Sequence, residues 1–265
     1  TEGIFGVPLG VSASFVFLFV LFGSLLDKAG AGEYFINLAF SMLGKYRGGS
    51  AKASIIASGF MGIMSGSSIA NTVTTGTFTI PLMKRTGFRP EQAAAVEVSA
   101  SSNGQLMPPV MGAAAFIIAE FLGMSYSDVV ISAFIPAFVA YFGLFYIVHL
   151  EALKLGLKGM DDEDIPPKWK TFIQGIHYLI PIMFLLYTLV VLRQSAASAA
   201  FNAIMLLMVL MVIQHPFRAF LAKEKLTKDI WLSGFVDILA GMISGAKNMV
   251  PIAVATALAG IVVGT

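Results

Sequence analysis

Five stretches of this chain contain no charged residue and are as long, or nearly as long, as a helix that crosses a lipid bilayer. Such a helix needs about 20 apolar residues. Of the 265 residues, 57% are hydrophobic and only 12% are charged, whereas soluble domains carry about 25% charged residues. The chain is therefore predicted to be an all-α polytopic membrane protein. The five stretches are residues 3–26, 129–148, 171–192, 194–214 and 248–265.

The composition also excludes several kinds of site. The chain has no cysteine, which excludes disulfides, thiolate zinc sites and cysteine nucleophiles. Its three histidines, His149, His177 and His215, do not have the spacing of metal ligands. A net charge of +2 is too small to indicate nucleic-acid binding. We expect no cofactor and no enzymatic activity, because an intramembrane enzyme would need a Ser/Lys, Ser/His or Asp pair at membrane depth.

Basic residues flank the uncharged residues 53–83 on both sides and indicate their topology. Loops rich in Lys and Arg stay in the cytoplasm, so both ends of this segment should lie on the same side. We therefore predict a re-entrant helical hairpin over residues 53–83, preceded by an interfacial helix over residues 34–44. The flanking basic residues are Lys45, Arg47, Lys52, Lys84, Arg85 and Arg89. Two further basic loops contain Lys154, Lys158, Lys168 and Lys170, and Arg218, Lys223, Lys225 and Lys228.

Small polar residues interrupt this hairpin and should form its tip: Ser65, Gly66, Ser67, Ser68 and Asn71. Irregular backbone at membrane depth is tolerated only within protein or beside a water-filled cavity. A Ser or Asn side chain can cap the second helix, whose first N–H groups then favour an anionic group. We predict that these residues bind a small organic anion. The alternative is that they only allow close helix packing.

A second interruption lies inside the apolar residues 98–119, where Gly104 and the pair Pro108-Pro109 should unwind a helix. Carbonyl and hydroxyl oxygens released by such a break suit a hard cation such as Na⁺. The alternative is a proline kink with a fully hydrogen-bonded backbone. The oxygens that could bind sodium therefore lie within residues 99–109.

Two acidic residues lie in the same region, Glu97 before the break and Glu120 at the end of the segment. Acidic residues inside a membrane are candidate proton relays. We expect Glu97 to face a wet interior near one interface and Glu120 to lie at the far interface. A proton-coupled carrier would depend on these carboxyl groups, and a passive channel would conduct without a saturable substrate.

A weak internal repeat predicts a duplicated architecture. Residues 62–67 and 260–265 share a pattern of small and apolar residues, and an amphipathic segment precedes each. Such duplications underlie many secondary transporters. Because the last apolar run has no polar flank, we expect an internal fragment of a longer protein.

The sequence is predicted to divide into four ranges. Residues 1–52 form a scaffold helix and an interfacial arm, and residues 53–122 form half of a transport domain, with hairpin 53–83 and broken helix 91–122. Residues 123–229 form scaffold helices with cytoplasmic loop 151–170, and residues 230–265 form a second arm and the start of a second hairpin.

Two motifs resemble a known transporter family. GIMSGSSIANTVTTG at residues 62–76, followed by IPLMKR at 80–85, resembles the first hairpin in the large membrane subunit of TRAP transporters, the tripartite ATP-independent periplasmic transporters. QLMPPVMGAAAF at residues 105–116 resembles the break that follows that hairpin. Together with VHLEA at 148–152, the motifs are most similar to the fused permeases of the TAXI branch.

This resemblance implies an inverted-repeat, elevator-type importer with Na⁺ as the coupling ion. It also implies an extracytoplasmic solute-binding protein, a small membrane subunit that can be fused to the large one, and a position in the lipid bilayer of a bacterial or archaeal inner membrane. Nucleic acid is not an expected partner. The resemblance places Ser65, Ser67, Ser68 and Asn71 at the hairpin tip. It places Ser102, Asn103, Gly104, Leu106 and Pro108 at an unwound segment that helps to bind sodium. These five residues, with Ser67 and Ser68, are the candidate sodium-binding residues that the resemblance implies.

Overall fold

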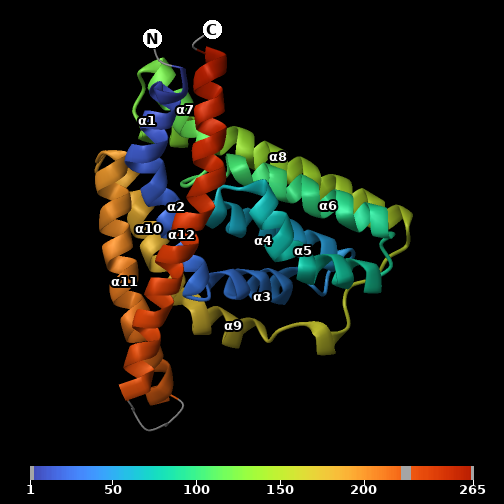
Figure 1. Cartoon of the computed structure of the whole chain (residues 1–265). Helices are drawn as coiled ribbons and strands as arrows, with labels where there is room; N and C mark the ends of the chain where they lie inside the picture. The colour runs from blue at the N-terminus through green and yellow to red at the C-terminus, as the bar shows by residue number, and fades with distance from the viewer. Residues whose placement is uncertain (1–2, 222–227, 264–265) are drawn as a thin grey trace. The chain divides into compact units, whose positions relative to one another are not determined.

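The computed structural model describes residues 3–221 and 228–263, with only the backbone for 218, 220, 221, 228, 229 and 263. It is 84% helical, and no strand occurs in those residues (Figure 1). The predicted all-α class is therefore confirmed. Lys223 and Lys225 of the third basic loop, and Gly264 and Thr265 of the internal repeat, lie outside the described residues.

Five helical segments are long and apolar enough to cross a membrane. They are Gly3–Lys28, Tyr126–Lys154, Asp162–Val191, Ala196–Phe217 and Ile230–Val262. The first two contain the uncharged runs 3–26 and 129–148 in full. The next two contain all but one or two residues of the runs 171–192 and 194–214, and the last contains residues 248–262 of the fifth run. The predicted interfacial segment is a separate helix, α3 (Ala31–Leu43), which is shorter than these spans.

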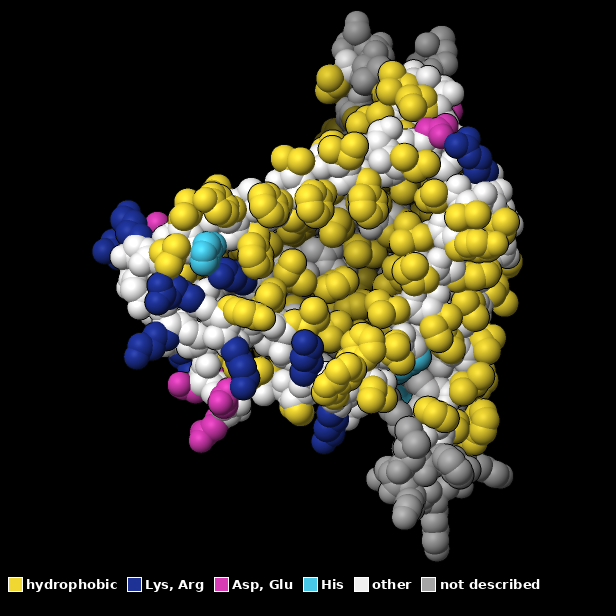
Figure 2. All heavy atoms as spheres, turned by 180° about the vertical axis from the view of Figure 1, so that it is seen from behind, with side chains coloured by type: hydrophobic (Ala, Val, Ile, Leu, Met, Phe, Trp, Pro, Cys, Tyr) yellow, Lys and Arg dark blue, Asp and Glu magenta, His cyan; other side chains and the backbone are white. Residues whose placement is uncertain are grey.

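Large apolar side chains remain on the surface of these segments. On α8 (Tyr126–Lys154), Phe134, Ile135 and Phe138 are 61%, 73% and 66% exposed. Figure 2 shows hydrophobic side chains over much of the face drawn, whereas most of its Lys and Arg side chains lie toward the left and the lower part of the view. Exposed apolar area is costly in water and is accommodated by lipid. The chain is therefore a multi-pass membrane protein.

The helices form two compact units. One comprises Thr1–Ala31, Ala113–Val129 and His177–Thr265, and the other comprises Gly32–Gly112 and Val130–Ile176. The predicted division into scaffold and transport ranges concerns roles in transport, and it stays a prediction.

The first unit is built around the packing of α12 on α2. An added Cβ at Gly241 would lie 2.6 Å from Leu25 Cδ2, and one at Gly245 would lie 3.0 Å from Leu21 Cδ1. Glycine on α12 therefore lets the two helices approach closely. The helices of this unit are α1 (Val7–Val11), α2 (Phe17–Lys28), α7 (Ala113–Leu122), α10 (Leu179–Leu186), α11 (Ala196–Leu221) and α12 (Lys228–Val263).

One continuous helix, α12, occupies the range predicted to hold a second arm and the start of a second hairpin. The structure differs from the sequence interpretation here, because the helix runs from Lys228 to Val263 with Pro251 inside it. A proline removes one backbone hydrogen bond and can kink a helix without ending it. The glycines that pack on α2 precede this proline, and the helix continues through Lys247 and Asn248, residue types that often stand at a helix end.

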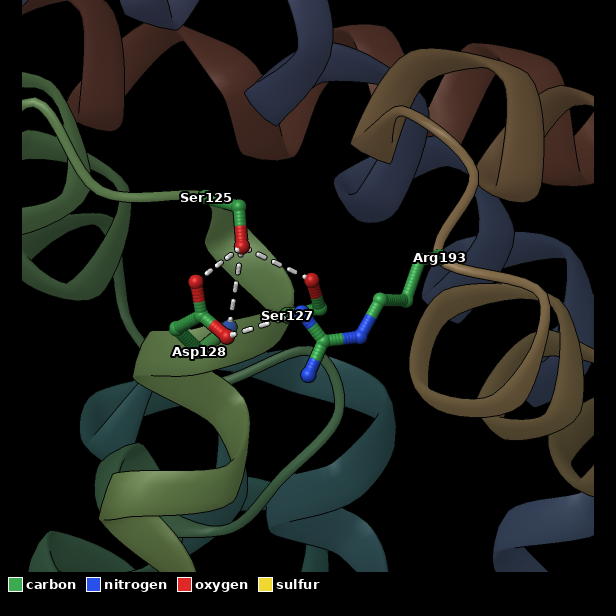
Figure 3. A network of polar contacts seen from close by, with 4 residues as sticks. All are labelled: Ser125, Ser127, Asp128 and Arg193. Carbon is green, nitrogen blue, oxygen red and sulfur yellow. Dashed lines mark hydrogen bonds and ion pairs between the residues drawn. The ribbon is translucent and has the colours of Figure 1, made fainter.

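A polar network joins the start of α8 to the loop before α11 (Figure 3). Ser125 Oγ donates to Asp128 Oδ2 at 2.6 Å and accepts from the backbone N–H of Asp128 at 3.3 Å. Arg193 Nη1 lies 3.8 Å from Asp128 Oδ1, with both side chains partly exposed. An exposed ion pair of this kind contributes about 0–1 kcal/mol. The main role of the network is therefore to cap α8, through the hydrogen bond that Ser125 Oγ accepts from Asp128 N–H.

The second unit contains the predicted hairpin. Three of its helices, α4, α5 and α6, each pack against the other two, and buried Ala51, Ile55, Met83, Ala93 and Ala100 belong to their shared core. Small residues on facing helices allow this close packing. The helices of this unit are α3, α4 (Gly49–Ser65), α5 (Ser68–Arg85), α6 (Pro90–Asn103), most of α8, and α9 (Lys168–Gly175).

Candidate substrate and ion site

The hairpin turns at two residues between α4 and α5. Gly66 ends α4 with φ 56°, a left-handed conformation that favours glycine, and its N–H donates to Gly62 O at 3.2 Å. Ser67 is extended, and its Oγ accepts from Ala70 N–H at 3.3 Å. Of the predicted capping residues, Ser67 is the one at the N-cap of α5.

The two arms are longer than the sequence indicates. They contain 17 and 18 residues, or about 26 Å each at about 1.5 Å per residue, against the roughly 20 Å expected for arms within residues 53–83. Both helices continue into the basic flanks, through Lys52 at one end and Lys84 and Arg85 at the other. Each arm still falls short of the roughly 30 Å of hydrocarbon in a typical bilayer.

The predicted break interrupts the helix after α6. A single 3-10 turn, Gly104–Leu106, follows α6, and α7 does not begin until Ala113. Between them Met107 is extended, the Pro108-Pro109 bond is cis, and Met111 has φ 50°. The chain thus leaves the helical path for the six residues before α7.

The break leaves fewer carbonyls without donors than the sequence predicts. Gly104 O accepts from Met107 N–H at 3.1 Å, Gln105 O from Gly112 N–H at 2.9 Å, and Met107 O from Met111 N–H at 3.3 Å. Tight local turns therefore satisfy these three carbonyls. A cation at this site would depend more on side-chain oxygens than the sequence interpretation assumes.

The hairpin tip and the break meet in the second unit. An added Cβ at Gly62 would lie 2.5 Å from Gly104 Cα and 2.7 Å from Gly104 O, so only glycine allows this approach. Gln105 Nε2 donates to Ser68 Oγ at 3.0 Å, and a Cβ at Gly66 would collide with Met111 O. Two predicted sites about 40 positions apart in sequence thus form one structural region.

Asn71 connects the hairpin to the break from a buried position. Its side chain is fully buried, and Nδ2 donates to Ser58 O on α4 at 2.9 Å. The same nitrogen lies 2.9 Å from the position of a Cβ on Gly104. The amide therefore sets the spacing between α5, α4 and the break, and direct contact of Asn71 with a substrate stays a prediction.

The other predicted residues differ in accessibility. Ser65, Gly66, Ser67, Ser68 and Asn103 are partly exposed, and Ser102 is exposed. Leu106 is 44% exposed. Within the described residues no side-chain hydrogen bond joins Ser102 or Asn103 to the tip, so Gly104, Gln105 and Met111 make that contact instead.

Pro108 has a different environment. It is buried and lines an apolar cavity of about 270 Å³ together with Gly59, Phe60, Met107 and Tyr141. The ring therefore faces hydrocarbon side chains, and its predicted part in binding sodium is limited to its backbone.

The two candidate proton relays lie in different environments, and one expectation is corrected. Glu97 has no exposed area and accepts hydrogen bonds from Ser54 and Ser58 on α4, so it does not face a wet interior. The surrounding hydroxyl groups, rather than water, solvate its carboxylate. Glu120 is exposed on α7, and its predicted place at an interface is untested.

Sequence reasoning missed the residues through which the region is assembled. Gly62, Gln105 and Met111 make the contact between tip and break. A signal for the buried environment of Glu97 was present in the sequence. Ser54 and Ser58 are four positions apart, as are Thr75 and Thr79, so each pair lies on one face of a helix.

A helical hairpin whose tip meets an interrupted helix inside a multi-pass membrane protein is the architecture of secondary-transporter membrane domains. The comparison with protein families agrees. The model described as "Tripartite ATP-independent periplasmic transporter, DctM component" matches residues 4–265. The chain belongs to this family, which confirms the predicted resemblance to the large TRAP subunit. The TAXI assignment and the fragment status stay predictions.

Curated relatives cover parts of the chain at low identity. A protein YgiK of Salmonella typhimurium is 26% identical over 51% of this chain and 31% of its own length. The 2,3-diketo-L-gulonate TRAP transporter large permease protein YiaN of Escherichia coli is 23% identical over 63% and 39%. The C4-dicarboxylate TRAP transporter large permease protein DctM of Rhodobacter capsulatus is 25% identical over 62% and 40%. The chain thus spans between 31% and 40% of the length of these relatives.

Proposed function

We propose that the complete protein imports small organic acids across the inner membrane of a bacterium or archaeon by sodium-driven secondary transport. In this proposal, the chain supplies the first hairpin and the broken helix of the transport unit. The observation that carries the proposal is the contact of the hairpin tip with the break through Gly62 and Gly104. Two interrupted elements that meet within the membrane are the best structural pointer to a transporter site.

An organic acid fits the chemistry of the tip. The first N–H groups of α5 carry partial positive charge, and the polar side chains of Ser67 and Ser68 beside them are partly exposed. The relatives YiaN and DctM are named as 2,3-diketo-L-gulonate and C4-dicarboxylate TRAP transporter permeases, and both substrates are organic acids. A carboxylate at the start of α5 is therefore the proposed substrate group.

Sodium would bind among the oxygens of the tip and the break. The proposed ligands are hydroxyl oxygens of Ser67, Ser68 and Ser102, the amide oxygen of Asn103, and backbone oxygens of Gly104, Leu106 and Pro108. Hard cations prefer such oxygen ligands. Binding of sodium would draw the tip and the break together, and the substrate carboxylate would then meet an ordered α5 N-terminus.

The proposal includes two protein partners and a moving unit. An extracytoplasmic solute-binding protein delivers the substrate, and a small membrane subunit, separate or fused, completes the membrane part. The hairpin and the broken helix move together as an elevator relative to a static scaffold. Membership of the tripartite family supports both partners.

Uptake measurements test the coupling ion. We expect the complete protein, reconstituted in proteoliposomes with its binding protein, to accumulate a labelled dicarboxylate under an inward sodium gradient. A proton gradient alone should drive no uptake. Uptake driven by protons alone would contradict the sodium assignment and favour the carrier that depends on Glu97 or Glu120, and conductance without saturation would indicate a channel.

A substitution at the helix cap tests the anion site. Ser67→Ala removes the side chain that accepts from Ala70 N–H, and loss of an N-cap costs about 1 kcal/mol. We expect KM for the substrate to rise about fivefold with a smaller change in the maximal rate. Ser198→Ala on α11 is the control, because its side chain is exposed and belongs to neither the tip nor the break. Unchanged KM and unchanged sodium dependence in Ser67→Ala would contradict this assignment.

A further inference from the structure

A single buried carboxylate connects the three helices that carry the tip and the break. Glu97 on α6 has no exposed area and accepts hydrogen bonds from hydroxyl groups on α4, α5 and α6. Its Oε2 accepts from Ser54 at 2.5 Å and from Thr79 at 2.5 Å. Its Oε1 accepts from Ser58 at 3.0 Å, from Ser101 at 3.3 Å, and from Thr75. We call these five residues the hydroxyl cage.

The local sequence makes room for this cage. Ser54 and Ser58 are one helical turn apart on α4, as are Thr75 and Thr79 on α5, so each pair faces the same neighbour. Gly76 lies between the two threonines, and a Cβ there would come within 3.2 Å of Glu97 Cγ. The absence of a side chain at Gly76 lets the glutamate enter between α4 and α5.

The cage holds the carboxylate by hydrogen bonds. None of the ion pairs found among the described residues involves Glu97. Ser54, Ser58 and Thr79 lie 2.5–3.0 Å from the carboxylate oxygens, the range of hydroxyl hydrogen bonds to a carboxylate.

Two residues of the hydroxyl cage, Thr75 and Ser58, form polar contacts with Asn71 at the hairpin tip. Thr75 Oγ1 lies 2.8 Å from Asn71 O, besides its contact with Glu97. Asn71 in turn donates to the backbone oxygen of Ser58, another cage residue, at 2.9 Å. Since Asn71 Nδ2 also borders Gly104, a short path of polar contacts runs from the carboxylate to the place where tip and break meet.

We infer that Glu97 is a positioning residue that, through its hydroxyl cage, sets the register of α4, α5 and α6 and so holds the hairpin tip against the break. Its removal would free α5 to move relative to α6, and the tip would then need more sodium to close. The expected change in sodium dependence rests on the proposed function. The expected change in the position of the tip without sodium does not rest on it.

A cysteine at the tip can report this effect. The 265 residues contain no cysteine, and Ile69 at the start of α5 is 78% exposed. The test uses the complete protein with Ile69→Cys, after any cysteine outside these residues has been replaced. The rate of reaction with a membrane-impermeant maleimide is measured over a range of sodium concentrations, with the melting temperature of each variant.

Three further substitutions are compared in this background. Glu97→Gln removes the charge at nearly the same size, and Thr75→Val removes one hydroxyl at the same shape. Thr77→Val is the matched control, because Thr77 is exposed on the same helix and bonds only to Thr74 O within the described residues. Loss of a hydrogen bond to a charged group weakens an equilibrium by roughly tenfold.

We expect Glu97→Gln and Thr75→Val to react with the maleimide several-fold faster than the control without sodium, and to need about tenfold more sodium for half of the protection. Reaction rates and sodium midpoints equal to those of Thr77→Val would overturn the inference. A lower melting temperature with a sodium-free reaction rate and a sodium midpoint equal to those of the control would also overturn it, because that result describes a structural role alone. If sodium has no effect on the parent protein but the two variants still react faster, the proposed coupling ion is wrong and the positioning role stands. If Glu97→Gln does not fold, Thr79→Val replaces it under the same criteria.

Discussion

Gly62→Ala is expected to lower sodium-driven uptake about thirtyfold and to lower the melting temperature of the protein. The new methyl group would lie 2.5 Å from Gly104 Cα, which is backbone and cannot rotate away. Overpacking of this kind costs about 2 kcal/mol, and the break would have to shift away from the hairpin. Initial uptake rates in proteoliposomes and thermal unfolding of the purified protein measure the two effects.

A control separates this clash from the general effect of alanine in a helix. Gly143 lies within α8, and a Cβ there would meet nothing within 4 Å. Alanine favours helix over glycine by about 1 kcal/mol, so Gly143→Ala should leave the melting temperature unchanged or slightly higher. If Gly62→Ala behaved like Gly143→Ala in both measurements, the close contact of the tip region with the break would be wrong.

Gly66→Ala is expected to abolish most uptake, because two independent costs act at this residue. Its φ of 56° is left-handed, which costs a non-glycine residue about 1 kcal/mol or more. In addition, its Cβ would collide with the backbone oxygen of Met111. We expect a loss of uptake greater than that of Gly62→Ala, with a fall in melting temperature of several degrees.

Gly123 provides a matched control for the backbone cost. It has φ 60°, but a Cβ there would meet nothing within 4 Å, so Gly123→Ala should show the conformational cost alone. Asparagine tolerates the left-handed region, and Gly123→Asn should therefore recover near-normal stability. Gly66→Asn should not recover, because the collision with Met111 remains. Recovery of uptake in Gly66→Asn would show that only the backbone conformation matters at the tip.

The sequence alone determined the features that depend on local physics. The membrane segments follow from the length of uncharged runs, because a bilayer requires about 20 apolar residues in succession. The turn at Gly66 and Ser67 follows from residues that adopt left-handed backbone or cap a helix. The break after Asn103 follows from Gly104 and the proline pair, since proline cannot continue a helical hydrogen-bond pattern.

Only the tertiary structure decided how these local elements combine. The contact of Gly62 with Gly104 joins residues 42 positions apart, and its distance depends on how α4 packs on α6. The environment of Glu97 was interpreted as wet from the sequence, whereas hydroxyl groups from three helices enclose it. The continuity of α12 was also missed, because its packing on α2 is not encoded in the residues near Pro251. Burial and close approach arise from helices that are distant in sequence, and no local pattern measures the space between them.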